Sequence, residues 1–254
     1  MLKSYVRSRF SEKKILLMTH IVIGYPSLAA SMEIVRTMVD AGVDLMELQI
    51  PFSEPIADGP VILKANQNAL ANGVTVDQCL DFGQAVARQF PIPFLYMTYY
   101  NIVFKYGVLR FADGMKAAGL QGAIVPDLPP EEAHDYLGAM KTNVLAPIFI
   151  YSPATSDARM HAIAQVADGF IYCVARKGVT GDRTDFSRQI GDYLERCRAA
   201  TNLPLALGFG VKDRSDIQFL EGKADIAVIG TQALRLVEDQ GISAVGNFIR
   251  DLQT

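Results

Sequence analysis

The chain has 254 residues, of which 50% are hydrophobic, and it carries a formal net charge of -3. A chain of this length can bury a large core, and single α/β barrels commonly have this size. Charged residues of both signs are scattered along the sequence without a basic patch, so nucleic acid and anionic membranes are poor partners for it.

The cysteines and the apolar runs indicate the compartment. Cys79, Cys173 and Cys197 lack the spacing of metal ligands, which predicts no metal site and fits a reducing cytoplasm. The apolar run over residues 15–26 is too short to span a bilayer. We therefore expect a soluble, cytoplasmic protein without a membrane segment.

Short apolar runs alternate with longer amphipathic stretches along the whole chain. Residues 28–42, for example, place Ile34, Val35, Met38 and Val39 on one stripe, which predicts a helix. Strand-like runs cover residues 15–24, 44–50, 93–99, 122–127, 143–150, 169–176, 204–210 and 224–231.

This alternation of strands and helices predicts a parallel sheet. Eight units can close into a (β/α)8 barrel or lie open as a doubly wound sheet. No G-x-G-x-x-G motif follows the first strand, where an open dinucleotide-binding sheet carries its fingerprint, so the barrel is favoured. We predict an α/β protein with a single domain over residues 1–254, a (β/α)8 TIM barrel. Its active site is expected at the carboxyl ends of the strands.

A carboxylate interrupts the second strand-like run, "DLMELQI". Side chains alternate along a strand, so Leu45, Glu47 and Gln49 are predicted to face the barrel interior. An acid shielded from water has its charged form disfavoured, which suits a proton donor and acceptor near neutral pH. The alternative is a structural acid that is hydrogen-bonded to backbone or paired with a lysine or arginine.

A second carboxylate, Asp58, follows in the loop that leaves the same strand, within "PFSEPIADGP". Considered alone, it is typical of a turn or a helix cap, because Asp-Gly-Pro is favourable turn chemistry. Its place on the same strand–loop unit as Glu47 favours a catalytic role, since both acids then lie at one end of the barrel.

Glycines follow the last three strand-like runs, in "ARKGVTGDR", "LGFGVKDR" and "VIGTQALRLVE". Barrel enzymes often bind phosphate through backbone N–H groups of the last two loops and a short helix start. Gly210 and Gly230 would let an anion approach the backbone, and Thr231 adds a hydroxyl. Tight strand-to-helix turns are the alternative. Residues 177–185 are interpreted either as a mobile lid or as a solvated surface loop.

The remaining polar side chains give weaker indications. His134 and His161 fall on predicted helices and are expected to be solvated. His20 could face the pocket, but we interpret it as a satisfied core histidine. Tyr172 is as consistent with a pocket hydroxyl as with a core aromatic. The chemistry is therefore expected to rest on acid–base groups and phosphate anchoring, without a metal or cofactor.

Six segments occur in order and at a spacing that carries a family resemblance: "MELQIPFSEPIADGP", "YYNIVFKYG", "VPDLPPEE", "APIFI", "ARKGVTG" and "GFGVKD". In these segments the chain resembles the alpha subunits of tryptophan synthase, nearly from end to end. The resemblance implies a (β/α)8 barrel that cleaves indole-3-glycerol phosphate to indole and glyceraldehyde 3-phosphate. It also implies a beta subunit, which uses pyridoxal phosphate to join indole to serine, in an alpha2-beta2 complex.

The same resemblance implies roles for individual residues. Glu47 matches the family's acid/base glutamate, and Asp58 matches the aspartate that orients the indole. The implied substrate-binding residues are Met97, Tyr99 and Ile124 in the indole pocket, Tyr172, Thr180 and Gly181 at the pocket and its closing loop, Phe209, and Gly210, Gly230 and Thr231 at the phosphate.

Some residues depart from those usual in the family. Gln49 stands where glycine is usual and is expected to crowd or repolarise the pocket beside Glu47. Tyr25 and Glu54 depart near partner-facing loops, and Pro126 stands where a small residue is common. These departures keep open a barrel of reduced turnover that mainly activates its beta subunit. A stand-alone indole-releasing lyase and another phosphate-binding barrel isomerase are further alternatives.

Overall fold

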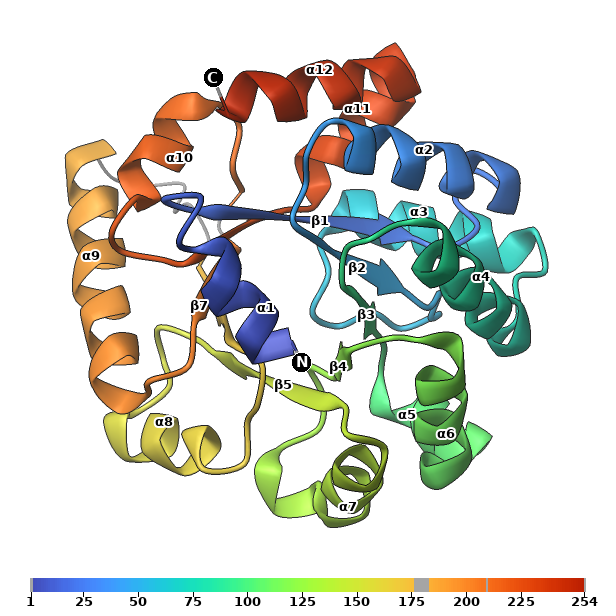
Figure 1. The fold of residues 1–254 in the computed structure, drawn as a ribbon, viewed down its shortest axis with the longest axis horizontal. Coiled ribbons are helices and arrows are strands. Elements are labelled where there is room, and N and C mark those ends of the chain that lie inside the picture. Colours follow the sequence, from blue (N-terminus) through green and yellow to red (C-terminus); the bar gives the residue numbers. More distant parts are fainter. Residues whose placement is uncertain (1, 176–182, 209, 254) are drawn as a thin grey trace.

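The computed structural model describes residues 2–175, 183–208 and 210–253. Eight parallel strands close into a barrel in which each strand pairs with the next along the chain and β8 pairs with β1 (Figure 1). The closed order confirms the predicted (β/α)8 barrel rather than the open sheet. The strands are β1 (Leu16–Val22), β2 (Leu45–Gln49), β3 (Phe94–Met97), β4 (Gly122–Ile124), β5 (Ala146–Tyr151), β6 (Ile171–Val174), β7 (Leu205–Gly208) and β8 (Ile226–Ile229).

The helices surround the barrel, and they are more numerous than the sequence pattern predicted. Two helices follow each of β2, β3 and β8, and one helix precedes β1. None in the described ranges is long and apolar enough to cross a membrane. The helices are α1 (Leu2–Arg9), α2 (Leu28–Asp40), α3 (Pro60–Ala71), α4 (Val76–Gln89), α5 (Tyr100–Tyr106), α6 (Val108–Ala118), α7 (His134–Asn143), α8 (Asp157–Ala164), α9 (Arg183–Ala200), α10 (Arg214–Leu220), α11 (Thr231–Gln240) and α12 (Ile242–Gln253), with a 3-10 turn, η1 (Pro130–Glu132), before α7.

Helix α2 shows how local sequence sets an element's limits and its buried face. Ser27 caps its first turn, because the Ser27 hydroxyl accepts a hydrogen bond from the backbone N–H of Ala30 at 3.1 Å. Ile34, Val35 and Met38, three of the residues in the predicted stripe, are buried. The stripe therefore packs α2 against the outer surface of the barrel.

Alternation along the strands separates an inner apolar layer from an outer one. On β2, Leu45 belongs to the cluster inside the barrel, whereas Met46 and Leu48 belong to the core between strands and helices. In the parallel pairing of β1 with β2, His20 lies opposite Glu47. Residues paired in this way share a face of the sheet, so His20 and Glu47 both point into the barrel.

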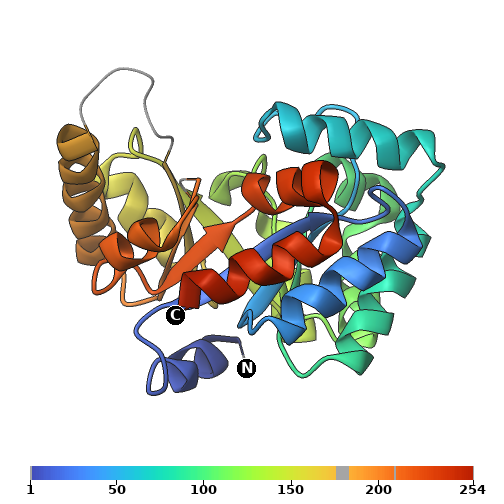
Figure 2. The same ribbon diagram turned by 90° about the horizontal axis from the view of Figure 1, so that it is seen from above.

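Helix α1 closes the amino-terminal end of the barrel. It lies across that opening (Figure 1) and apart from the helices that surround the strands (Figure 2). Leu2 and Val6 are buried in the inner apolar cluster, together with Leu45 and Phe170. The helix thus provides the apolar cover that this end of the barrel would otherwise lack.

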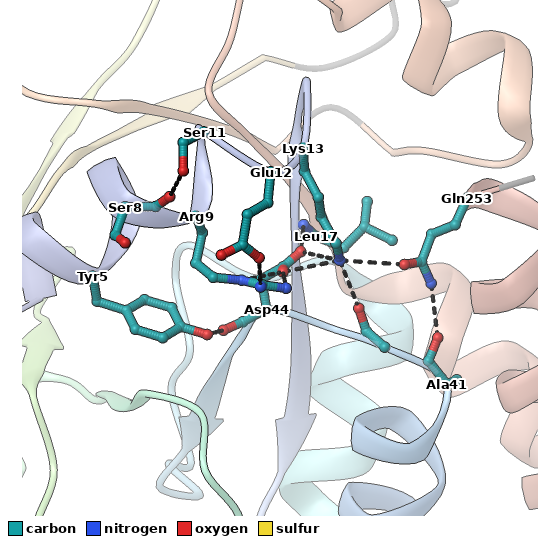
Figure 3. A network of polar contacts seen from close by, with 11 residues as sticks. Tyr5, Ser8, Arg9, Ser11, Glu12, Lys13, Leu17, Ala41, Asp44 and Gln253 are labelled. Carbon is teal, nitrogen blue, oxygen red and sulfur yellow. Dashed lines mark hydrogen bonds and ion pairs between the residues drawn. The ribbon is translucent and has the colours of Figure 1, made fainter.

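A polar network around Asp44 fastens this cover to the start of β2 (Figure 3). One carboxylate oxygen lies 2.9 Å from Arg9 Nη2 and 2.9 Å from Lys13 Nζ. The other oxygen accepts a hydrogen bond of 2.9 Å from the backbone N–H of Leu17. The hydroxyl of Tyr5 donates to the backbone oxygen of Asp44 at 2.9 Å. Both oxygens of this buried carboxylate are therefore satisfied.

Candidate active site

Glu47 lies inside the barrel on β2, where it is 3% exposed. Its Oε1 lies 3.1 Å from Nδ1 of His20 and accepts a hydrogen bond of 3.4 Å from the hydroxyl of Tyr172. Within the described ranges neither a lysine nor an arginine pairs with this carboxylate, and no group hydrogen-bonds its Oε2. Glu47 is held through one oxygen, and the other remains open to a ligand.

His20 differs from the satisfied core histidine that the sequence suggested. It is 3% exposed, and its Nδ1 faces Glu47, but its Nε2 is buried without a partner in the described part of the chain. Burial disfavours the imidazolium. The hydrogen bond to Glu47, the charges of Glu47 and Asp58 and the polar side chain of Gln49 outweigh this effect and raise the pKa of His20 above its ordinary value of 6.5. The pair of His20 and Glu47 is evident only from the register between β1 and β2, because no local sequence motif indicates it.

Asp58 lies at the same end of the barrel, in the loop between β2 and α3. Its Oδ2 accepts hydrogen bonds from Gln49 Nε2 at 2.6 Å and from the hydroxyl of Tyr99 at 3.2 Å. Burial raises the pKa of Asp58, while the charge of His20 and the two hydrogen bonds oppose that rise. The backbone N–H of Ala57 donates to the Tyr99 hydroxyl at 3.1 Å, which ties this loop to the end of β3.

Gln49 points toward the Asp58 loop. Its side chain is fully buried, and Nε2 also lies 3.4 Å from Oδ1 of Asn66. Asn66 in turn accepts a hydrogen bond of 2.9 Å from the backbone N–H of Phe52, in the same loop. Gln49 Oε1 is buried without a partner among the described residues. The glutamine therefore brings an amide against Asp58.

An apolar wall stands beside these polar groups. Met97, Tyr99 and Ile124 are buried in the inner cluster, at the carboxyl ends of β3 and β4. Phe52 stacks on Tyr99 with ring centroids 5.0 Å apart, and Tyr172 packs against the same cluster from β6. A wall of this kind suits a flat aromatic ligand whose polar edge meets the carboxylates.

The glycines after β7 and β8 frame the start of α11. Helix α11 begins at Thr231, and Gly230 at its N-cap provides no side-chain hydrogen bond, so the first N–H groups remain available to an anion. A Cβ added to Gly230 would lie 3.6 Å from Cβ of His20, which places this corner beside His20. Gly210 has a φ of +87°, and a Cβ added there would meet no described atom within 4 Å.

Thr180, Gly181 and Phe209 lie outside the described residues, as does the stretch 177–182 of the proposed lid. Residues 183–185 form the start of α9. Two of the unusual residues are placed on the surface around the barrel mouth. Glu54 is exposed on the Asp58 loop, and Tyr25 is partly buried between β1 and α2. His134 and His161 are exposed on α7 and α8, as predicted.

A cavity of about 610 Å³ lies away from these residues, between the segments that follow β4 and β5. Its lining includes Asp127, Ser152 and Arg159, and none of Glu47, Asp58 or the other candidate side chains described above. Among the described residues, no group of three or more histidine, cysteine or acidic side chains is placed to hold a metal ion. We therefore place the candidate active site at Glu47 and Asp58 rather than at the cavity.

Proton transfer is the chemistry for which the carboxyl end of the barrel is equipped. Two carboxylates in different surroundings lie at that end, and the start of α11 favours anions. This combination is typical of (β/α)8-barrel enzymes that use general acid–base catalysis.

Comparison with known proteins identifies the family within this class. The family described as tryptophan synthase alpha chain matches residues 7–250. The tryptophan synthase alpha chain of Syntrophotalea carbinolica is 66% identical over 253 residues, covering 100% of each chain. That of Desulforapulum autotrophicum is 61% identical over 252 residues, covering 99% of this chain and 100% of the relative.

A solved structure agrees with this assignment. The crystal structure of tryptophan synthase subunit alpha from Legionella pneumophila has a TM-score of 0.89 at 29% identity, and the match covers 99% of this chain and 96% of that chain. The chain belongs to the tryptophan synthase alpha chain family. It is a lyase of tryptophan biosynthesis.

Proposed function

We propose that Glu47 and Asp58 are the catalytic residues of this chain's reaction, the cleavage of indole-3-glycerol phosphate to indole and glyceraldehyde 3-phosphate. The observation that carries the proposal is the setting of Glu47. Its carboxylate is buried inside the barrel mouth and held through Oε1 by His20 and Tyr172, and no described residue hydrogen-bonds its Oε2. An acid held in this way can exchange protons with a ligand in the pocket.

The reverse aldol cleavage needs two proton transfers and one stabilised charge. Indole C3 gains a proton, the bond from C3 to the hydroxyl-bearing carbon breaks, and the hydroxyl loses its proton as the aldehyde forms. Glu47 serves both transfers, because C3 and the hydroxyl are close neighbours in the substrate. Asp58 accepts the indole N–H and offsets the positive charge that protonation places on the ring.

The other candidate residues orient the substrate. Met97, Tyr99, Ile124 and Tyr172 would enclose the indole, which their burial and stacking support. The backbone of Gly210, Gly230 and Thr231 would bind the phosphate at the start of α11, which converts binding energy into orientation. The proposed substrate contacts of Thr180, Gly181 and Phe209 rest on the resemblance alone.

The substitution Glu47→Gln tests the proposal, because it preserves size and removes the ability to carry a proton. General acid–base groups contribute about 100- to 10,000-fold, so indole release should fall by that factor. Glu33→Gln, which alters an exposed acid on α2, is the matched control and should keep wild-type activity. Near wild-type indole release by folded Glu47→Gln would refute the assignment.

We propose a beta subunit as partner, in an alpha2-beta2 complex, with pyridoxal phosphate in the beta subunit and no cofactor in this chain. Family membership supports the partner. Exposed apolar side chains beside the site support its location: Ile56 is 79% exposed on the Asp58 loop, and Phe104 is 69% exposed on α5. A partner on these residues would hold the Asp58 loop in place.

Titration with purified beta subunit tests this partnership and separates the alternatives. Ordering of the Asp58 loop should raise indole release by roughly 10- to 100-fold, which needs about 1.4 to 2.7 kcal/mol of differential binding. A flat response despite complex formation would favour a stand-alone lyase. Persistently low cleavage with a stimulated beta subunit would favour a barrel that acts mainly as an activator.

We further propose that residues 1–254 form one domain that works in the cytoplasm. The closed barrel, whose first and last strands pair, supports the single domain. The free, buried state of Cys79, Cys173 and Cys197 supports a reducing compartment.

A further inference from the structure

Two buried polar atoms beside the carboxylates, Nε2 of His20 and Oε1 of Gln49, make no hydrogen bond of good geometry among the described residues, although the Gln49 side chain is near enough to help raise the pKa of His20. A buried imidazole with one unsatisfied nitrogen costs free energy that a hydrocarbon side chain at the same place would avoid. His20 occupies an inward position on β1 between Met18, which is apolar, and the barrel mouth. Packing therefore does not explain a histidine at this position.

The charges around His20 are acidic. Glu47 faces it from β2 and Asp58 from the following loop, while β8 presents Gly230, which has no side chain. Tyr172 from β6 reaches the same Glu47 oxygen as His20 does. Within the described part of the site, His20 is the one side chain that can carry a positive charge between two carboxylates.

We propose that His20 is a positioning residue that shares with Glu47 the proton used in the cleavage. The inference rests on the proposed role of Glu47. In the resting site the pair holds one proton, with the imidazolium donating from Nδ1 to Oε1 of Glu47. His20 thereby keeps Glu47 oriented and keeps a proton available at a pH where an isolated carboxyl group has lost its own.

The proton balance closes over one turnover. The proton of the pair passes through Glu47 to indole C3, and the positive charge on the ring faces Asp58. The bond from C3 to the hydroxyl-bearing carbon breaks, and its electron pair restores the indole ring. The hydroxyl proton then returns to Glu47 and the pair. No proton is gained or lost, and neither an oxidant nor a metal is needed.

The pH dependence of kcat tests the shared proton. His20→Phe removes the imidazole with which Glu47 shares the proton, so an imidazole no longer sets the pH at which that proton is lost. The alkaline limb of the profile, measured with the full chain at saturating indole-3-glycerol phosphate, should therefore shift by at least about one pH unit. An alkaline limb at the wild-type pH would overturn the proposal.

His20→Asn separates the hydrogen bond from the proton and covers the case in which His20→Phe fails to fold. Its amide can occupy the place of Nδ1 and donate to Glu47, but it does not titrate. We expect kcat at low pH to stay within about tenfold of wild type, with the alkaline limb shifted as in His20→Phe. A wild-type alkaline limb in His20→Asn would show that orientation alone matters, and would overturn the shared proton.

Nuclear magnetic resonance of the imidazole nitrogens gives a readout that does not depend on turnover. His20 is assigned by its absence in His20→Asn, and the exposed His134 and His161 serve as references. The midpoint of His20 should lie above 6.5 in the wild type and fall in Glu47→Gln, which removes the negative charge beside it. An unchanged midpoint would refute the pair. If the midpoint falls but Glu47→Gln retains indole release, the proposed reaction role fails and the pair stands.

Discussion

The start of strand β2 and its carboxyl-terminal half hold buried carboxylates in opposite surroundings. Just before the strand, Asp44 meets Arg9, Lys13 and the N–H of Leu17, so both carboxylate oxygens are satisfied. Further along the strand, the described residues hold Glu47 through one oxygen only and leave one nitrogen of the nearby His20 without a hydrogen bond. Both acids are almost completely buried. The difference lies in how many of their bonding positions the fold itself fills.

This difference separates stability from reactivity on one strand. A fully paired carboxylate offers nothing to a ligand and fastens α1 to the barrel. A partly paired one lowers stability but keeps bonding positions for a substrate. Barrel enzymes in general place chemistry at the carboxyl ends of their strands and stabilising contacts at the amino ends. Here the division falls between residues 44 and 47.

We call the surroundings of Glu47 and Asp58 the reactive end, and a substitution there should have the largest effect. Asp58→Asn keeps the shape of the side chain, and its amide oxygen can still accept from Gln49, but it cannot offset charge on the indole ring. We expect indole release to fall by about 100- to 10,000-fold, equivalent to about 3 to 5 kcal/mol in the barrier. Steady-state kinetics with circular dichroism as a folding control checks this. A loss smaller than tenfold would count against the catalytic role.

A substitution at Asp44, whose carboxylate is fully hydrogen-bonded, should lower stability and leave catalysis intact. Asp44→Ala removes the acceptor for Leu17 N–H and the common partner of Arg9 and Lys13, which should lower the free energy of unfolding by about 3 kcal/mol. Urea unfolding measures this change, with the exposed Asp113→Ala as control. The kcat per folded molecule should not change. A large fall in kcat at full folding would show that the two ends are coupled.

The phosphate corner gives an intermediate effect that belongs to the reactive end alone. A side chain fits at Gly230, because an added Cβ would make only an ordinary contact with His20, but its methyl groups would block the backbone from an anion. Gly230→Val should weaken glycerol phosphate binding by about tenfold, or about 1.4 kcal/mol. Calorimetric titration measures this, and Gly230→Ala should show a smaller loss. Unchanged binding in Gly230→Val would show that the phosphate binds at another site.

The smallest expected effect is the stability that the protein loses by burying the Asp58 carboxylate. Burial raises the pKa of Asp58 above its ordinary value of 3.8, so the unfolded chain releases this proton at lower pH than the folded chain does. Stability is then lost as pH rises from the ordinary value through the folded one. Asp58→Asn should therefore unfold at higher urea concentration than wild type at pH 7, and this gain should vanish below about pH 3. A gain that persists in acid would have another origin.

The fold was predictable because it depends on repeated local patterns. Eight apolar runs separated by amphipathic stretches indicated the barrel, and alternation along β2 placed Glu47 inside it. The role of α1 was not predictable in this way, because the basic residues of the first segment mask the two apolar positions, Leu2 and Val6, that close the barrel end. The sequence pattern also did not predict the second helices after β2, β3 and β8, because each pair of helices lies within one long amphipathic stretch.

The site was predictable where a residue stood out from its local background. Glu47 and Asp58 did, as acids in an apolar strand and a proline-rich loop. His20 did not, because its partner lies on another strand and only the register between β1 and β2 joins them. Gln49 was noticed, but its contact with Asp58 depends on the path of a loop and on a side-chain rotamer that the sequence leaves open.

The position of α1 has a consequence for how the protein is made. Leu2 packs so closely on Gly169 that an added Cβ there would lie 2.8 Å from Leu2 Cδ2. Ribosomes add about 5 to 20 residues per second, so Leu2 waits roughly ten to thirty seconds before Gly169 is synthesised. During that interval part of the barrel surface on which the apolar face of α1 packs has not yet been synthesised. Helix α1 therefore cannot complete its contacts until long after its own synthesis, and its apolar face remains accessible to chaperones while the barrel assembles.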